Sequence, residues 1–240
     1  AVFSSFLSIF SLFTLGVYAL DEREENIVVY TENYPPFNFA NPETGEITGF
    51  ATKIVRDILN ETGLDYEIRL LPWKRAIRAV KTKKNALIYT IVRAPLRAHQ
   101  YRWLVPISQA DFHVYMRADD ERILSYEALK AGEYTASCVA QDITCELLTS
   151  LGIPGENITA VPNDKTGDFR MVIAGRTDLF IGDDDIYRYL RDVEKINVSL
   201  VRKVLPVNVE TGFYLAGNAE LPDVIAQKII AAYALVKQSN

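Results

Sequence analysis

The stretch Tyr-Thr-Ile-Val-Arg-Ala-Pro-Leu-Arg-Ala-His-Gln-Tyr-Arg-Trp, residues 89–103, is the part of the chain around which the fold is organised. It overlaps an apolar run at 86–90, which is typical of a buried strand, and then becomes basic and irregular. Arg93 and Arg97 follow this predicted strand closely. Guanidinium groups at the carboxyl end of a strand are suited to bidentate binding of a carboxylate or a phosphate. A solvated basic loop is the alternative, and the rest of the chain distinguishes the two.

The composition is that of an ordinary globular protein. The chain has 240 residues, of which 49% are apolar and 24% are charged, so it is long enough for one large domain or two small ones. The net charge is −5 and the isoelectric point is near 5.2. This acidic balance argues against nucleic acid as a partner, and it makes the arginine cluster a local feature of the chain.

Residues 1–20 contain no charged side chain and are mostly apolar. Val17 and Ala19 are tolerated residues at the −3 and −1 positions of a signal-peptidase site, and an acidic run at 21–25 follows. We therefore predict a signal peptide over residues 1–20, cleaved near Ala19, and a periplasmic location for the exported protein. An uncleaved N-terminal anchor is the alternative, although the apolar run is short for a membrane span.

Cys138 and Cys145 are the only cysteines. An even number of cysteines in an exported protein favours a disulfide, and closing so short a loop corresponds to about 2.5 kcal/mol of loop-closure entropy. Two buried free thiols are the alternative. The only histidines are His99 and His113, so we expect no metal site, and no motif indicates a cofactor.

The first part of the chain alternates predicted strands and helices. Apolar or alternating runs at 26–31, 66–70 and 86–90 predict strands, and apolar stripes that begin after Gly49 and after Pro72 predict helices between them. This order, with short connections, indicates a parallel sheet with right-handed crossovers.

After Pro106 the alternating pattern restarts. Strands are predicted at 110–116, 134–140, 158–161, 178–182, 200–204 and 212–216, and helices at 121–131, 142–151, 164–174, 183–190 and from Pro222 onward. We therefore predict an α/β fold with two lobes, each a mostly parallel sheet flanked by helices. Lobe 1 comprises residues 21–109 and 207–240, and lobe 2 comprises residues 110–206. Hinges are expected near 107–111 and 205–211, and the ligand cleft between the lobes.

In their order and spacing, several short pieces resemble the type II periplasmic solute-binding proteins, specifically family 3, which binds polar amino acids for ABC transporters. The resemblance covers residues 26–237. The pieces that carry it are Tyr34-Pro-Pro-Phe37, Gly49-Phe50, the spacing from Arg97 to Trp103, Gly175-Arg-Thr-Asp178 with Asp183, and Gly212-Phe-Tyr-Leu-Ala216.

The resemblance implies roles for particular residues. Arg97, six residues before Trp103, would clamp the α-carboxylate of the ligand, and Asp183, five residues after Asp178, would pair with its ammonium group. Tyr34 would stack on the ligand. The family also implies a monomer that delivers a small solute, an amino acid or related carboxylate, to the membrane permease of an ABC transporter.

The sequence departs from the family pattern at several positions. Val92 and Ala94 replace the usual hydroxyl residues of the carboxylate site, which leaves Thr90 as the nearby hydroxyl, and Arg93 is an additional guanidinium. We expect a cleft that is aromatic and basic on one side and acidic on the other, suited to a zwitterionic or anionic solute. The candidate ligand-binding residues are Tyr34, Phe37, Trp73, Arg75, Thr90, Arg93, Arg97, Gln141, Asp142, Thr144 and Asp183.

Simpler structural roles remain open for some of these residues. Trp73 lies on the apolar stripe of its helix and could pack in the core, and the carboxylates at 183–185 could only cap a helix. Two other classes of protein share the expected fold: ligand-binding modules of receptors, and a few lyases or dehydratases. The sequence carries no Gly-x-Ser-x-Gly motif, Cys/His signature or phosphate loop, so we expect a binding protein and not an enzyme.

Overall fold

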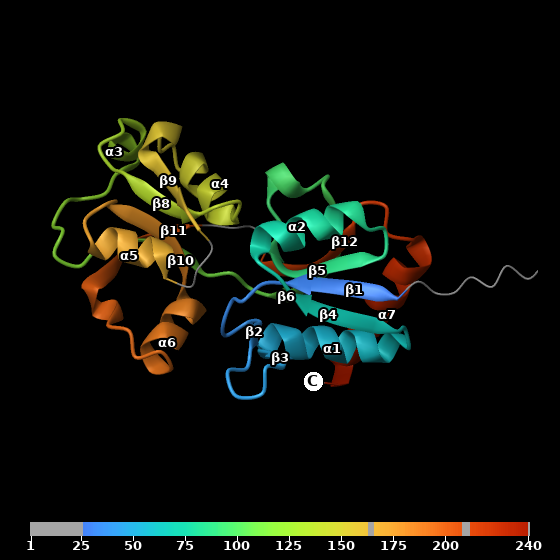
Figure 1. Cartoon of the computed structure of the whole chain (residues 1–240). Helices are drawn as coiled ribbons and strands as arrows, with labels where there is room; N and C mark the ends of the chain where they lie inside the picture. The colour runs from blue at the N-terminus through green and yellow to red at the C-terminus, as the bar shows by residue number, and fades with distance from the viewer. Residues whose placement is uncertain (1–25, 163–165, 208–211, 240) are drawn as a thin grey trace, which may run out of the picture.

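The computed structural model describes residues 26–162, 166–207 and 212–239. Two five-stranded sheets with their helices form two lobes that lie side by side (Figure 1). The predicted signal peptide at 1–20 and its cleavage site lie outside the described residues. Within the described part of the chain, no helix has both the length and the apolar character needed to span a bilayer.

The first sheet has the strand order β4-β1-β5-β12-β6, the second has the order β11-β7-β10-β8-β9, and a small sheet joins β2 to β3. The strands are β1 (Ile27–Thr31), β2 (Phe39–Ala40), β3 (Ile47–Thr48), β4 (Tyr66–Leu70), β5 (Ala86–Val92), β6 (Tyr101–Ser108), β7 (Phe112–Arg117), β8 (Ala136–Val139), β9 (Ile158–Val161), β10 (Leu179–Asp183), β11 (Val201–Val207) and β12 (Phe213–Asn218). The helices are α1 (Phe50–Thr62), α2 (Trp73–Thr82), α3 (Tyr126–Lys130), α4 (Ile143–Ser150), α5 (Gly167–Ile173), α6 (Asp184–Asp192) and α7 (Asp223–Ser239), with 3₁₀ turns η1 (Pro95–Arg97), η2 (Gly155–Asn157) and η3 (Val198–Leu200).

Both sheets are mixed. In each sheet the antiparallel pairings are made by a strand next to a connection between the lobes, β12 in the first sheet and β7 in the second. In the first sheet β4, β1 and β5 are parallel, whereas β12 runs antiparallel to β5 and β6. In the second sheet β9, β8 and β10 are parallel, whereas β7 runs antiparallel to β10 and β11. β6 leads into the second lobe and β12 returns from it, so the lobes are joined by two connections.

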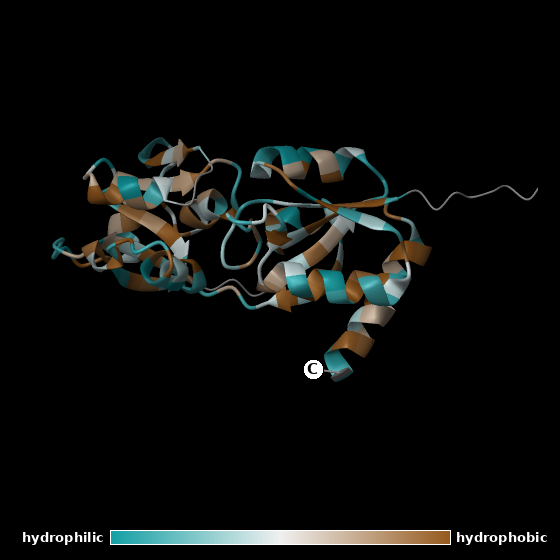
Figure 2. Cartoon of the chain, turned by 60° about the horizontal axis from the view of Figure 1, so that its bottom comes forward, coloured by the Kyte–Doolittle hydropathy of each residue, from teal (hydrophilic) through white to brown (hydrophobic). Residues whose placement is uncertain are grey.

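The first sheet is buried on both faces. Val29 and Leu87 pack in the cluster that contains the apolar stripes of α1 and α7, while Tyr30 and Ile88 pack against α2 on the other face. This alternation follows from the period of two in a strand. Figure 1 shows α2 on one face and α1 on the other, and Figure 2 shows apolar residues along the strands at the centre of each lobe.

Some predicted elements were wrong or incomplete. Residues 101–108 form the strand β6, which the sequence does not predict because Pro106 interrupts the apolar pattern; β6 lies at the edge of its sheet, where a proline is tolerated. The helix predicted at 121–131 is only Tyr126–Lys130, because the Ser125 side chain caps it by accepting a hydrogen bond from the Ala128 N–H. The helix predicted at 164–174 is found as Gly167–Ile173, and residues 163–165 are outside the described part.

The predicted disulfide between Cys138 and Cys145 is confirmed, with a Cα–Cα distance of 5.1 Å. It joins β8 to the first turn of α4. The Asp142 side chain also accepts a hydrogen bond from the Thr144 N–H and so caps this helix, as the sequence predicts. The disulfide and the cap fix the start of α4.

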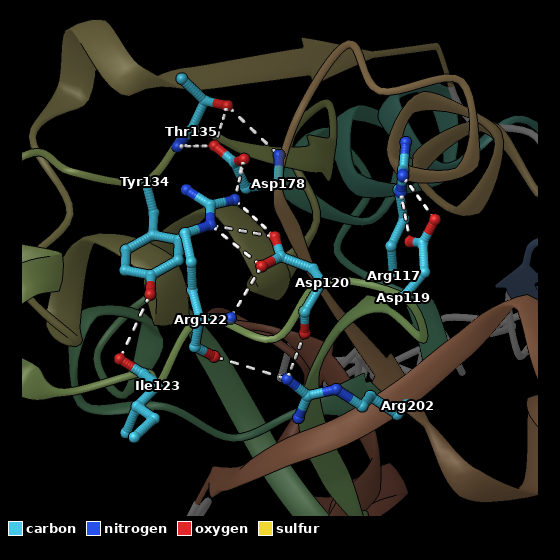
Figure 3. Close-up of polar contacts among 9 residues, drawn as sticks. All are labelled: Arg117, Asp119, Asp120, Arg122, Ile123, Tyr134, Thr135, Asp178 and Arg202. Atoms are coloured by element: carbon cyan, nitrogen blue, oxygen red, sulfur yellow. Dashed lines mark hydrogen bonds and ion pairs between the residues drawn. The ribbon is translucent and has the colours of Figure 1, made fainter.

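Asp178, part of the Gly175-Arg-Thr-Asp178 element, has a structural role in the second lobe (Figure 3). Its carboxylate accepts hydrogen bonds from the Thr135 N–H and hydroxyl, at 2.8 and 2.7 Å. It also pairs with Arg122, whose guanidinium bonds Asp120 at 2.6 Å and lies 4.6 Å from the centre of the Tyr134 ring. This network holds together the segments that precede β8 and β10.

The two connections between the lobes pass very close to each other. A Cβ atom on Gly212 would lie 2.0 Å from the carbonyl oxygen of Ser108, so only glycine fits at this crossing. Phe112 and Phe213 join the cores of the lobes, with ring centroids 6.0 Å apart. Residues 208–211 of the predicted second hinge lie outside the described residues.

Candidate functional site: a cavity between the lobes

A cavity of about 60 Å³ lies where the loop after β1 meets the second lobe. The first lobe contributes residues 32–35, and the second contributes residues from the ends of β8 and β10 and from α4, α5 and α6. A single water needs roughly 10–15 Å³ by this measure, so the cavity has room for a group of a few heavy atoms. The loop that supplies the first wall turns sharply at a cis Pro35–Pro36 bond, closed by a hydrogen bond of 2.6 Å from the Tyr34 N–H to the Asn38 carbonyl.

The wall of this cavity is acidic. Four carboxyl side chains line it, from Glu32, Asp142, Asp168 and Asp183. Among the described lining residues there is no lysine, arginine or histidine. The sequence predicts a cleft that is basic on one side, and the described wall does not have this property. A positively charged group is therefore favoured in the cavity over a negative one.

Asp183 is the most deeply buried of the four carboxylates, with 2% of its surface exposed. It ends β10 and caps α6, accepting a hydrogen bond from the Asp185 N–H at 2.9 Å and another from the Asp111 N–H at 3.1 Å. Burial raises the pKa of Asp183 to about 6, although these two backbone donors oppose the shift. No described lysine or arginine forms an ion pair with it. A bound cation would supply that missing charge.

Three hydroxyl groups share the cavity with the carboxylates. Tyr34 is half-buried and stacked on Phe37, with ring centroids 5.4 Å apart; burial, and next the charge of Asp183, raise the pKa of its phenol well above the ordinary value. The hydroxyls of Thr144 and Tyr187 are buried, and in the described part of the chain neither has a hydrogen-bond partner. Thr144 is 6% exposed. Buried polar groups without partners are rare, so these hydroxyls indicate a place for a ligand.

Beside the cavity, two residues of the first lobe reach directly to the second. The Trp73 indole N–H donates to the Gln141 carbonyl at 3.1 Å. Arg97, 6% exposed, donates from Nε and Nη2 to one carboxylate oxygen of Glu146, at 2.9 and 2.7 Å. Nη2 also lies 3.4 Å from the Gln141 carbonyl. Gln141 has a φ of 66°, a left-handed conformation that is costly for a side chain with a Cβ and that is often found at functional sites.

The structure separates the eleven predicted ligand-binding residues into groups. Four line the cavity: Tyr34, Asp142, Thr144 and Asp183. Three form the contact between the lobes beside it: Trp73, Arg97 and Gln141. The remaining four, Phe37, Thr90, Arg93 and Arg75, are on neither.

Three of these four side chains lie away from the cavity, in the core or at the surface. Phe37 is 0% exposed and packs beneath Tyr34, so it has no surface to offer a ligand. Arg93 lies 5.9 Å from the ring centres of both Trp103 and Tyr214, and Arg75 is exposed to solvent. These three side chains therefore lie away from the cavity wall.

Thr90 affects the cavity indirectly. Tyr89 pairs with Leu215 and Ile91 with Tyr214, so Thr90 is the extra residue of a β-bulge, with a φ of 59°. Its hydroxyl donates to the Asn38 side chain at 2.5 Å, and that side chain donates to the Glu32 carbonyl at 2.7 Å. The bulge therefore supports the loop that forms the first wall.

Sequence reasoning missed several residues at this site. Glu32, Asp168 and Tyr187 line the cavity, and the carboxylate of Glu146 forms an ion pair with Arg97. Glu32 directly follows the last residue of β1. Because ligands bind at the carboxyl ends of parallel strands, its position could have identified it as a candidate site residue. Nothing in the local sequence distinguishes Glu146 from a surface glutamate of α4.

Comparison with known proteins gives a consistent picture. The family described as bacterial extracellular solute-binding proteins, family 3, matches residues 27–233. A probable amino-acid ABC transporter-binding protein of Haemophilus influenzae is 25% identical over 121 residues, which are 50% of this chain and 47% of that protein. The aligned part of the chain spans about half the length of this curated relative.

Solved structures share the fold over most of the chain. A histidine kinase sensor domain with similarity to periplasmic binding proteins has a TM-score of 0.75 and 19% identity, covering 90% of this chain and 91% of that one. An ancestral arginine-binding protein bound to arginine has a TM-score of 0.71 and 20% identity, covering 89% and 92%. The arginine-, lysine-, histidine-binding protein ArtJ of Geobacillus stearothermophilus has a TM-score of 0.72 and 16% identity, covering 90% of each chain. At these identities the likeness establishes the fold alone.

Proposed function

Because the chain belongs to the bacterial extracellular solute-binding proteins, family 3, we propose that it is an exported periplasmic protein that closes its two lobes over a small solute carrying a positively charged amine. The solute is an amino acid or a related amine. Delivery to the membrane permease of an ABC transporter follows the role named for the Haemophilus influenzae relative. The protein acts as a monomer and catalyses no reaction.

The acidic cavity wall is the observation that carries this proposal. A cation transferred from water into a buried site needs an opposite charge beside it, and Asp183 offers a carboxylate whose hydrogen-bond donors among the described residues are two backbone N–H groups. An anionic solute would meet four carboxylates and no described cation on the wall, so a cationic or zwitterionic solute is favoured.

Closure is a hinge motion between lobe 1, residues 21–109 and 207–240, and lobe 2, residues 110–206. The hinges are near 107–111 and 205–211. The membership of the two sheets supports this division, because the strands of the second sheet lie between β6 and β12 in the chain. Two adjacent connections between rigid lobes are a typical hinge arrangement.

A ligand-binding module of a receptor is the second candidate function, and the likeness to a histidine kinase sensor domain favours it. Both functions need the same cavity. They differ in whether deletion of the gene abolishes uptake of the ligand or only a response to it. A lyase on this fold is a third candidate, and recovery of the ligand chemically unchanged after long incubation would count against it.

A thermal-shift screen tests the proposed function. The probes are arginine, lysine, agmatine and putrescine as cations, glutamine and alanine as neutral zwitterions, and glutamate and succinate as anions. A ligand at a hundred times its Kd stabilises by about 2.7 kcal/mol, which corresponds to a rise in Tm of several degrees, roughly 5–10 °C, for a chain of this size. We expect the cations to give the largest shifts. A rise in Tm with glutamate and succinate alone would show that the solute is an anion and that the proposed positive charge is wrong.

A further inference from the structure

The guanidinium of Arg97 is occupied by a carboxylate of the protein itself. Nε and Nη2 of Arg97 both donate to Oε1 of Glu146, so the edge of the guanidinium formed by these two nitrogens already binds a carboxylate of the protein. The Arg97 side chain is 8% exposed and the Glu146 side chain 30% exposed, so this pair is mostly shielded from water. Charge-assisted hydrogen bonds are stronger than neutral ones, and removing one partner of a shielded pair leaves the other charge without compensation.

Glu146 is also held in place by its own helix. Cys145, the preceding residue, is bonded to Cys138 on β8, and the start of α4 is capped by Asp142. The neighbouring Gln141 carbonyl accepts from both Trp73 and Arg97, which holds the same loop against the first lobe. The backbone near Glu146 therefore cannot retreat without breaking these contacts, and a ligand carboxylate would have to displace the glutamate side chain.

The described lining of the cavity offers no basic side chain that could replace Arg97. None of the described residues that line it is basic, and four are acidic. A ligand carboxylate placed there would lie beside the like charge of the buried Asp183, with the amide of Asn33 and the hydroxyls of Thr144, Tyr187 and Tyr34 as described side-chain donors. The ammonium or guanidinium end of a ligand, in contrast, can pair with Asp183.

We propose that Glu146 takes the place of the ligand carboxylate on Arg97, so that the cavity selects aliphatic amines or guanidines that have no carboxylate over the corresponding amino acids. This inference rests on the proposed function and specifies the class of solute. Arg97 then joins the two lobes when they are closed, and Asp183 serves as the counter-ion of the ligand.

The test is isothermal titration of the wild-type protein with matched pairs that differ only by a carboxylate: agmatine and arginine, cadaverine and lysine, putrescine and ornithine. We expect the member without a carboxylate to bind about tenfold or more tightly, because displacing one charge-assisted contact changes affinity by about tenfold to a hundredfold. Equal affinities, or tighter binding of the amino acids, would overturn this inference and leave the proposed function intact. Binding of neither member of any pair would overturn both.

Glu146→Gln supplies a second readout. The amide keeps the shape of the side chain but releases the charge of Arg97, so arginine should bind about tenfold more tightly than to the wild-type protein, while agmatine changes little. Glu127→Gln, on the exposed helix α3, is the matched control because it changes the net charge by the same amount. An E146Q protein that binds the amino acids no better than E127Q would contradict the role given to Glu146.

Discussion

The buried carboxylate of Asp183 accepts a hydrogen bond from the backbone N–H of Asp111, with 3.1 Å between the two atoms. Asp183 lines the cavity, whereas Asp111 lies in the connection from β6 to β7. One oxygen of the carboxylate is thus tied to the chain where it crosses between the lobes. A cation that neutralises Asp183 would therefore act directly beside the proposed hinge.

The first prediction concerns the pH dependence of binding. The pKa of Asp183 is raised by burial to about 6, so at neutral pH the carboxylate is charged and able to hold a cation. Affinity for an amine should fall as the pH is lowered through about 6, by up to about tenfold per pH unit below it. Isothermal titration at several pH values between 5 and 8 measures this change. An affinity that stays constant over the range would rule out Asp183 as the counter-ion.

The same residue affects stability without ligand in the opposite direction. An Asp whose pKa is higher in the folded state than the ordinary 3.8 binds more protons when folded, between pH 3.8 and about 6. Its contribution to the free energy of unfolding is therefore fully present below about 3.8 and is lost as the pH rises through about 6. Urea unfolding measures this effect. Between pH 3.8 and about 6, the free energy of unfolding of Asp183→Asn should depend less on pH than that of the wild-type protein.

The second prediction concerns the Asp178 network of Figure 3. Burial alone would raise the pKa of Asp178, but hydrogen bonds from Thr135 and the charge of Arg122 outweigh burial and hold it below 3.8. The stabilisation is therefore present above that value and is lost as the pH falls through the lowered pKa. Asp178→Ala should lower the free energy of unfolding by about 1–3 kcal/mol, because it leaves Arg122 and Thr135 without this partner.

The control for this prediction is Asp119→Ala. Asp119 also pairs with an arginine, Arg117, but its side chain is 71% exposed, so its loss should be smaller. Urea unfolding at pH 7 compares the two variants. Ligand affinity should be the same in both, because neither side chain lines the cavity. Equal losses of stability would contradict the structural role of Asp178.

The third prediction concerns the disulfide. Replacing both cysteines, Cys138→Ser with Cys145→Ser, should lower the free energy of unfolding by about 2.5 kcal/mol, because the short loop is no longer closed in the unfolded chain. Denaturant unfolding of the double variant measures this loss, and the wild-type protein treated with reductant should give a similar value. No change in either experiment would show that the bond does not contribute to stability.

The sequence predicts those parts of the fold whose signals are local. The apolar runs of β1 and β5 and the apolar stripe of α1 depend on neighbours within one element, and all three are found. The sequence does not predict β6, because Arg102 and Pro106 interrupt its apolar pattern. This edge strand is stabilised by its pairing with β12, more than a hundred residues later in the chain.

The site is less predictable, because it depends on which side chains meet across the lobes. The order of motifs predicts that Asp183 and Tyr34 lie together at a cleft, and both line the cavity. The pairing of Arg97 with Glu146 joins residues 49 positions apart, in different lobes. The local sequence around either residue therefore does not predict it. The acidic character of the wall likewise arises from four separate segments.

The central claim is that a cationic solute is held between the lobes by the carboxylate of Asp183. The most direct measurement is isothermal titration, at pH 7.5, of the wild-type protein, Asp183→Asn and Asp185→Asn with the cation that gives the largest thermal shift. Asp185 is the matched control: it also lies at the start of α6, but it pairs with Arg188 and does not line the cavity. We predict that D183N weakens binding by about tenfold to a hundredfold while D185N binds as the wild type does. Undiminished binding by D183N would contradict the account.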